Sequence, residues 1–202
     1  MIERAVHLTA SVLLSYPDDR LAEALPLLNM TVRGMPAGEP AKRLGAFLDH
    51  VSVTPLPDLA EHYVAVFDFR RRCCPYLTYY TYGDTRKRGM ALLRFKHAFR
   101  EAGFEPADGE LPDHLAVVCE LSARGATEQA RRLLREHRAG LDLLLKALEA
   151  EGSPYADVVA AVLATLPPST ARERAAAARL AAEGPPAEEV GLPAYPTPGA
   201  TR

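Results

Sequence analysis

The chain has 202 residues, a formal net charge of −2 and 48% hydrophobic residues, so it is long enough to bury one core without covalent staples. Its three cysteines are too few for a disulfide framework, and the sequence shows neither a signal-like leader nor an apolar run of about 18 to 20 residues. These features argue against a disulfide scaffold and a membrane-spanning protein, and we expect a soluble, cytoplasmic one.

Apolar residues recur at helical spacing through the first 70 residues. The pattern predicts a helix at the start of the chain and a second from Asp18, and the glycines and prolines of residues 29–40 favour a loop. A further helix from Asp58 places Tyr63 and Phe67 on its inner face.

Residues 70–83 break the helical pattern with a run of arginine, cysteine, tyrosine and threonine. The run has strand propensity, but no partner strand is predicted, so we interpret it as an ordered irregular segment. Asp84 is a suitable N-cap for the long helix that follows, and Gly103 suits its C-terminal end. Pro112 is expected to open the next helix, with three more amphipathic helices up to residue 166.

Alternation of apolar and polar residues with period two is absent, so the sequence predicts an all-α fold, a single-domain bundle of about eight to ten helices over residues 1–166. Residues 167–183 form a possible peripheral alanine-rich helix with a capping box at its start. Residues 184–202 are rich in proline, glycine and alanine, and we expect a disordered tail.

The small net charge conceals a basic central segment. Residues 67–100 hold nine basic and two acidic residues, a net charge of +7, and the rest of the chain carries −9. Such a segment could bind an anion such as RNA, a nucleotide or an acidic protein surface, or pair with acidic flanks of its own fold. The clustered basic residues are Arg70, Arg71, Arg72, Arg86, Lys87 and Arg88.

No motif for catalysis or nucleotide binding stands in the sequence: phosphate-binding glycine loops and the hydrolase elbow are missing. Cys73, Cys74, Cys119 and a histidine such as His97 or His114 match no zinc spacing, so we expect neither a metal site nor an enzyme. The pair Asp113-His114 suits a helix N-terminus, but it could also form a polar cluster at the rim of a groove, with His114 titrating near neutral pH.

Two segments resemble the delta subunit, or NarJ-type assembly chaperone, of respiratory nitrate reductase, within the wider group of TorD-like chaperones. One is Arg-Arg-Cys-Cys-Pro-Tyr-Leu-Thr-Tyr-Tyr at residues 71–80, continuing with Gly-Asp-Thr-Arg-Lys-Arg-Gly-Met-Ala-Leu-Leu at residues 83–93. The other is Glu-Leu-Pro-Asp-His-Leu at residues 110–115, of the form E-x-P-D-H. The resemblance extends over about residues 1–166.

The resemblance implies a helical, non-enzymatic chaperone that binds the apo catalytic subunit of nitrate reductase, including its N-terminal, signal-like peptide. Molybdenum cofactor delivery proteins are further candidate partners. It would bind no cofactor stably itself. Its client would receive the molybdenum bis-guanine-dinucleotide cofactor and iron–sulfur clusters before membrane docking. A nucleotide- or RNA-binding module that uses residues 67–100 is the alternative.

A helical chaperone can hold an amphipathic peptide by burying its apolar face in a groove with a polar rim. By position, Asp113 and His114 match the motif linked to client-peptide binding. We expect Asp113→Ala or His114→Ala to weaken peptide binding and leave the fold intact. The candidate peptide-binding residues are Tyr63, Phe67, Tyr76, Tyr79, Tyr80, Asp113 and His114.

Overall fold

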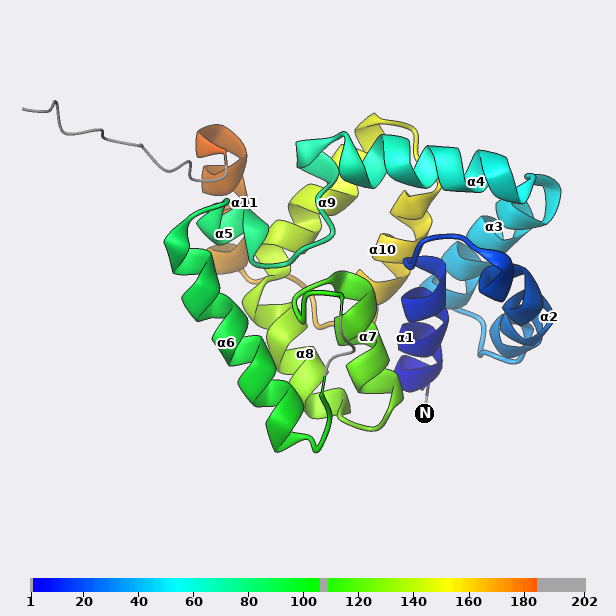
Figure 1. Cartoon of the computed structure of the whole chain (residues 1–202), viewed down its shortest axis with the longest axis horizontal. Helices are drawn as coiled ribbons and strands as arrows, with labels where there is room; N and C mark the ends of the chain where they lie inside the picture. Colours follow the sequence, from blue (N-terminus) through cyan, green and yellow to red (C-terminus); the bar gives the residue numbers. More distant parts are fainter. Residues whose placement is uncertain (1, 106–108, 185–202) are drawn as a thin grey trace, which may run out of the picture.

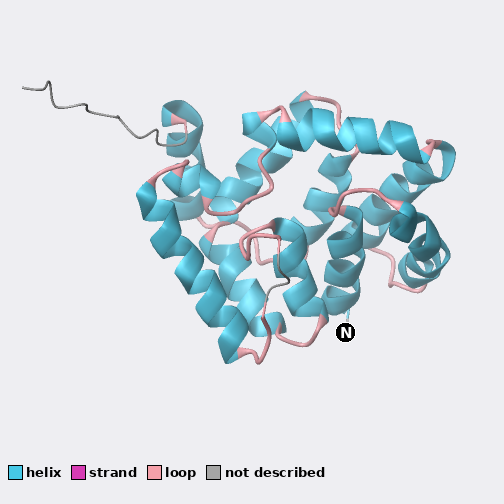
Figure 2. Ribbon diagram, viewed as in Figure 1, coloured by secondary structure: helices cyan, strands magenta, loops and turns pink. Residues whose placement is uncertain are grey.

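The computed structural model describes residues 2–105 and 109–184, and this part of the chain consists of helices joined by loops (Figure 2). The all-α prediction is confirmed. The described residues form eleven α-helices, one π-helical turn (η1) and one 3-10 turn (η2). In chain order they are α1 (Ile2–Leu13), α2 (Asp19–Arg33), α3 (Glu39–Val53), α4 (Leu56–Tyr63), η1 (Val64–Asp68), η2 (Arg71–Cys73), α5 (Tyr79–Tyr82), α6 (Arg86–Glu101), α7 (Leu115–Ala123), α8 (Thr127–Glu136), α9 (Arg138–Ala150), α10 (Tyr155–Leu163) and α11 (Ala171–Glu183).

Helix α1 lies among the other helices of the core (Figure 1). It packs against α7 most extensively, and also against α2, α3 and α10. Val6, Ala10 and Leu13, one turn apart on its inner face, are almost completely buried. Helix α10 continues this core between α3 and α9, so segments from both ends of the sequence share one hydrophobic interior.

An aromatic cluster fixes the helix that the sequence placed ahead of the irregular segment. Tyr63 and Phe67 lie with ring centroids 4.8 Å apart, and Tyr155 of α10 packs against both, at 5.8 Å and 4.9 Å. The Tyr63 hydroxyl donates to the carbonyl of Leu14 at 3.2 Å. Both rings are buried within the hydrophobic cluster, so they belong to the core.

A buried histidine ties α1 to two distant segments. Nδ1 of His7 lies 2.7 Å from Oγ of Ser122, and Nε2 lies 2.9 Å from Oγ1 of Thr165. Burial lowers the pKa of His7 to about 4, so the ring is neutral at pH 7 and joins the two hydroxyls as part of the core.

Helix α2 extends further than its sequence pattern suggested. It runs to Arg33, into residues 29–40 where we expected a loop. Leu28 and Val32 are buried on its inner face. Burial of these side chains outweighs the local preference for a loop.

The start of α6 also differs from the prediction. Thr85, rather than Asp84, occupies the N-cap position, and its hydroxyl donates to the carbonyl of Tyr82 at 2.8 Å. The Asp84 carboxylate instead accepts from Nη1 of Arg88 at 3.2 Å. At the other end, Gly103 adopts a left-handed conformation with φ of +76°, as expected just after a helix.

Helix α11 packs along α9. The capping box expected at its start is present: Oγ1 of Thr170 accepts from the Glu173 amide, and the Glu173 carboxylate accepts from the Thr170 amide. Only Ala177 of this helix is buried. The tail expected to be disordered lies, apart from Gly184, outside the described residues. Within the described ranges, no helix is both long and apolar enough to cross a bilayer.

Candidate functional site

The two segments that carry the family resemblance pack against each other. Residues 70–83, expected to be irregular throughout, contain the turn η2 and the one-turn helix α5, and we call the whole segment the tyrosine loop. It runs antiparallel to the Glu110–Leu115 segment, with a backbone bridge between Tyr76 and His114. The Leu77 amide donates to the carbonyl of Asp113 at 2.9 Å, and the Leu115 amide donates to that of Pro75 at 3.0 Å. Segments more than 30 residues apart thus form one unit, which we call the motif junction.

Asp113 is the buried centre of the motif junction, with no exposed surface. Its Oδ2 accepts from the Thr78 hydroxyl at 2.5 Å and from the Thr78 amide at 3.2 Å. Side-chain and backbone bonds together hold the loop against the segment before α7. Asp113 therefore positions the loop, and its carboxylate is closed off from any peptide at the surface.

Arg88 of α6 completes this buried arrangement. Its Nε donates to Oγ1 of Thr78 at 3.1 Å, its Nη2 lies 3.7 Å from Oδ2 of Asp113, and its guanidinium lies 5.3 Å from the ring centre of Tyr76. Arg88 Nη2 and Asp113 Oδ1 are buried and form no hydrogen bond within the described chain. The two charged groups thus face each other without filling all of their hydrogen-bonding positions. Removing either one is expected to lower the free energy of unfolding, because the other charge would stay buried without a partner.

His114 serves as the N-cap of α7. Its Nδ1 accepts from the Ala116 amide at 3.2 Å, and the Tyr76 ring packs edge-on against it at 5.1 Å. Burial lowers the pKa of His114, which keeps Nδ1 unprotonated and able to accept. Helix α7 therefore begins at Leu115, and Pro112, expected to open it, lies in the preceding turn.

Tyr76 is the half-exposed residue of the motif junction. Its hydroxyl donates to Oε1 of Glu110 at 3.0 Å, and the same oxygen accepts from the Leu111 amide at 3.0 Å. The acid of the E-x-P-D-H motif thus holds the ring over His114, and the first, fourth and fifth motif residues all face the tyrosine loop.

Tyr79 and Tyr80 form the opposite side of the loop, against α9. Their rings lie 5.8 Å apart, edge to face. The Tyr80 hydroxyl donates to the carbonyls of Arg72 and Cys74, both at 3.0 Å. Gly140 makes this packing possible, because a Cβ there would lie 2.9 Å from Cδ2 of Tyr80. The sequence analysis missed Gly140; its one signal is a glycine inside a strongly helical stretch.

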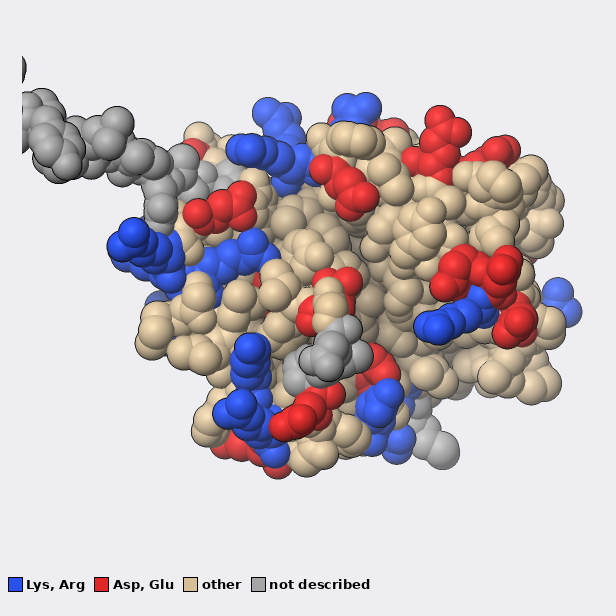
Figure 3. All heavy atoms as spheres, viewed as in Figure 1, with Lys and Arg blue, Asp and Glu red and all other residues tan. Residues whose placement is uncertain are grey.

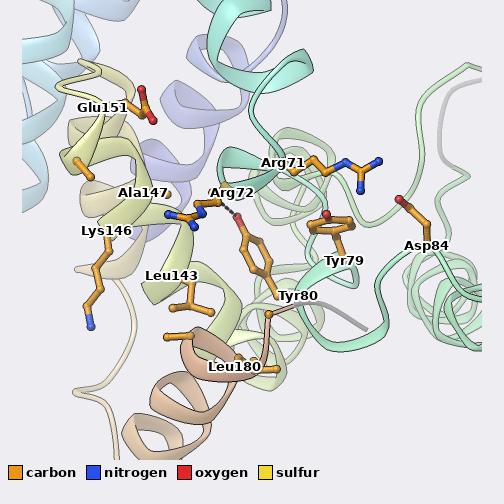
Figure 4. Close-up of a pocket in the computed structure, with 13 residues that line it drawn as sticks. Arg71, Arg72, Tyr79, Tyr80, Asp84, Leu143, Lys146, Ala147, Glu151 and Leu180 are labelled. Carbon is orange, nitrogen blue, oxygen red and sulfur yellow. Dashed lines mark hydrogen bonds between the residues drawn. The ribbon is translucent and has the colours of Figure 1, made fainter. Parts of the chain in front are cut away.

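A pocket of about 890 Å³ opens beside these two rings (Figure 4). The tyrosine loop, α9 and the C-terminal end of α11 form its walls. The predicted residues Arg71, Arg72, Tyr79 and Tyr80 line it. The lining residues that the sequence did not indicate as part of a site are Asp84, Leu143, Lys146, Ala147, Ala150, Glu151, Leu180, Ala181 and Gly184.

The clustered basic residues do not act as one patch. Arg70 pairs with Glu151 at 3.0 Å, and Arg88 is enclosed in the motif junction. Arg71 and Arg72 lie at the pocket, while Arg86 and Lys87 are exposed at the start of α6. On the face shown in Figure 3, basic side chains gather over α5 and α6, and acidic ones are more frequent over α2 to α4.

The cysteines lie inside the fold. Cys73 and Cys119 are buried and Cys74 is half-buried, all as free thiols. Burial raises the pKa of Cys74 to about 11 and that of Cys119 further, so both are unreactive thiols at neutral pH. Among the described residues, no group of three or more histidine, cysteine or acidic side chains could hold a metal ion.

The structure thus divides the predicted peptide-binding residues into three groups. Tyr63 and Phe67 belong to the core, Tyr76, Asp113 and His114 to the motif junction, and Tyr79 and Tyr80 to the wall of the pocket. The structure brings the second and third groups together on the two sides of one loop, and Tyr63 of the first group lies close enough to Tyr76 and Glu110 to interact electrostatically with them.

Comparison with known proteins places this arrangement in a family. The family model described as nitrate reductase delta subunit matches residues 35–161. The chain is 33% identical, over 156 residues, to the probable nitrate reductase molybdenum cofactor assembly chaperone NarJ of Bacillus subtilis (strain 168). That alignment covers 77% of this chain and 85% of the relative.

Two further relatives support the match. NarJ of Escherichia coli (strain K12), named as a nitrate reductase molybdenum cofactor assembly chaperone, is 31% identical over 160 residues, which are 77% of this chain and 66% of that protein. The nitrate reductase-like protein NarX of Mycobacterium tuberculosis (strain ATCC 25618 / H37Rv) is 40% identical over 156 residues, only 23% of its length. The chain therefore belongs to the nitrate reductase delta subunit family.

Proposed function

We propose that the chain is an assembly chaperone for a respiratory nitrate reductase. It binds the apo catalytic subunit, including the N-terminal peptide of that subunit. It thereby keeps the subunit competent to receive the molybdenum bis-guanine-dinucleotide cofactor and iron–sulfur clusters before membrane docking. The chain itself has no catalytic role and holds no cofactor of its own.

The motif junction is the observation that carries this proposal. The residues that resemble the chaperone family do not form a catalytic constellation. They build a rigid loop with a pocket at its side. A loop clamped on one face and open on the other is suited to hold a partner chain. The names of the Bacillus and Escherichia relatives support the same function.

The structure also suggests how the work is divided between residues. Tyr79 and Tyr80 line the pocket and are the candidates for contact with the client. Asp113 and His114 act through the loop: Asp113 holds Thr78, and His114 caps α7. Their effect on client binding is thus indirect.

Purification of the tagged chain from cells grown with nitrate at low oxygen tests the proposal. We expect the catalytic subunit of nitrate reductase to co-purify. In cells that lack the chain, we expect that subunit to accumulate with little molybdenum. A folded chain that captures no such subunit, with normal molybdenum content in the deletion strain, would overturn the proposal.

A further inference from the structure

We propose that the pocket beside the tyrosine loop binds an acidic segment of the client that also carries apolar side chains. This rests on the proposed function in one respect, namely that the client supplies the segment. The pocket combines an apolar floor with cations that form no ion pair with any other described residue, and this combination specifies the chemistry of the ligand.

The cations of the pocket are unpaired. Arg71, Arg72 and Lys146 line it, and none of the three forms an ion pair within the described residues. The two acids of the lining are already engaged: Asp84 pairs with Arg88, and Glu151 pairs at 3.0 Å with Arg70, the first arginine of the loop. The field in the pocket is therefore positive.

The apolar part comes from two helices. Leu143 of α9 and Leu180 of α11 face the pocket, together with small alanine side chains. Figure 4 shows Arg72 extending from the tyrosine loop toward α9, with Arg71 on the side of Tyr79. A volume of about 890 Å³ accommodates several side chains. Aliphatic groups would lie against the leucines and carboxylates would lie against the planar guanidinium groups.

A peptide carboxylate suits this pocket better than a polyphosphate. Phosphate sites use the free amides at helix N-termini, but α9 and α11 present their C-terminal ends here, at Ala150 and Gly184. Those ends carry partial negative charge. This offsets part of the positive field, and the three cations of the lining exceed its two acids by one charge, which matches a carboxylate better than the several charges of a triphosphate.

The probe is an array of overlapping 15-residue peptides that covers the catalytic subunit of nitrate reductase. The test protein is the full chain with Arg71→Gln and Arg72→Gln, two exposed positions that form no ion pair with another described residue. The matched control is Arg20→Gln with Arg33→Gln, two exposed arginines of α2. Each protein is measured at low and high salt, with and without ATP.

We expect the pocket variant, but not the control, to lose roughly tenfold in affinity for peptides of net negative charge that contain leucine or similar residues. Rising salt concentration is expected to weaken the binding of the same peptides. The proposal is wrong if the affected peptides are neutral or basic, if none depends on the two arginines, or if ATP binds in their place. Failure of the whole subunit to bind would instead reject the proposed function.

Discussion

At the scale of single residues, the motif pair Asp113-His114 shows how burial changes the meaning of a sequence motif. Both side chains were candidates for contact with a peptide, but both are enclosed by the tyrosine loop. The sequence showed their type and their position before a helix. It could not show that Thr78 and Arg88 surround the carboxylate, because those contacts arise only when distant segments meet.

The expectation that Asp113→Ala leaves the fold intact is therefore revised. The substitution leaves the Thr78 amide and hydroxyl without their acceptor, and it removes the buried carboxylate that faces Arg88. We expect the free energy of unfolding to fall by about 3 kcal/mol, and client binding to weaken as the loop loosens. Urea titration followed by circular dichroism measures the first effect, and calorimetry with the client's N-terminal peptide measures the second.

Asp84→Ala is the matched control, since Asp84 pairs with the same Arg88 but is 70% exposed in its side chain. We expect its effect on unfolding to stay below about 0.5 kcal/mol. An equal loss of unfolding free energy in both variants would show that burial of the Asp113 carboxylate does not cause the destabilisation.

His7 makes stability depend on pH. Burial depresses its pKa to about 4 in the folded protein, against about 6.5 in the unfolded chain. As the pH falls, the unfolded chain therefore takes up a proton at His7 before the folded protein does. The contribution of the neutral ring is complete above pH 6.5 and disappears as the pH falls to 4, by roughly 3 kcal/mol.

Unfolding measured in urea at several pH values between 7 and 4 checks this contribution. In His7→Asn, which cannot titrate at that position, we expect a weaker dependence on pH than in the original chain. Parallel curves for the two proteins would contradict the assignment, because the remaining histidines are common to both.

At the scale of elements, the contact between α9 and the tyrosine loop depends on one missing side chain. Tyr80 packs over Gly140 closely enough that a Cβ would collide with its ring. We expect Gly140→Ala to lower the free energy of unfolding by about 1 kcal/mol, because the clash outweighs the gain in helix propensity. The displaced ring should also alter the pocket.

Gly89→Ala is the control, since Gly89 lies in α6 with nothing within 4 Å of the added Cβ. There we expect an increase of about 0.5 to 1 kcal/mol. Chemical denaturation of both variants gives the comparison, and a stabilised Gly140→Ala protein would show that Tyr80 moves aside freely.

The capping box stabilises the first turn of α11. In Thr170→Ala the Glu173 amide loses its acceptor, and we expect the local stability of α11 to fall by about 1 kcal/mol. Hydrogen exchange should then be faster in α11 and unchanged in α10. Thr31→Ala, which removes a hydroxyl on the exposed side of α2, should leave α11 unaffected.

Much of the element order could be predicted from the sequence, because helical periodicity and capping residues act over one or two turns. The limits of α2 and the cap of α6 could not, since packing of Leu28 and the pairing of Asp84 with Arg88 decided them. For the site, the sequence identified the tyrosine loop and its arginines. It missed Lys146 and Leu180, whose place at the pocket depends on how α9 and α11 pack.

At the scale of the whole molecule, the basic residues and the hydrophobic core come from different parts of the sequence. The basic residues of the central segment lie in the tyrosine loop and α6, where some of them pair with acids of their own fold and others line the pocket. The core instead joins the two ends of the sequence through α1 and α10. The fragment matched by the family model would therefore retain the motif junction, but it would lose α1 from the core and α11 from the wall of the pocket.

Truncation tests this division. The family match covers residues 35–161, which excludes α1, although Val6, Ala10 and Leu13 fill the core. Burial of two aliphatic side chains of this size contributes several kcal/mol, comparable to the whole stability of a domain. We therefore expect the fragment 35–161 to lack a cooperative unfolding transition and dispersed amide signals in a nitrogen–proton NMR spectrum.

The fragment 1–170 is the matched control, because it keeps α1 and loses α11, of which only Ala177 is buried. We expect it to fold, with a moderately lower melting temperature. A folded fragment 35–161 would show that α1 is dispensable to the core. An unfolded fragment 1–170 would show that α11, despite its exposed surface, stabilises α9 as much as the core helices do.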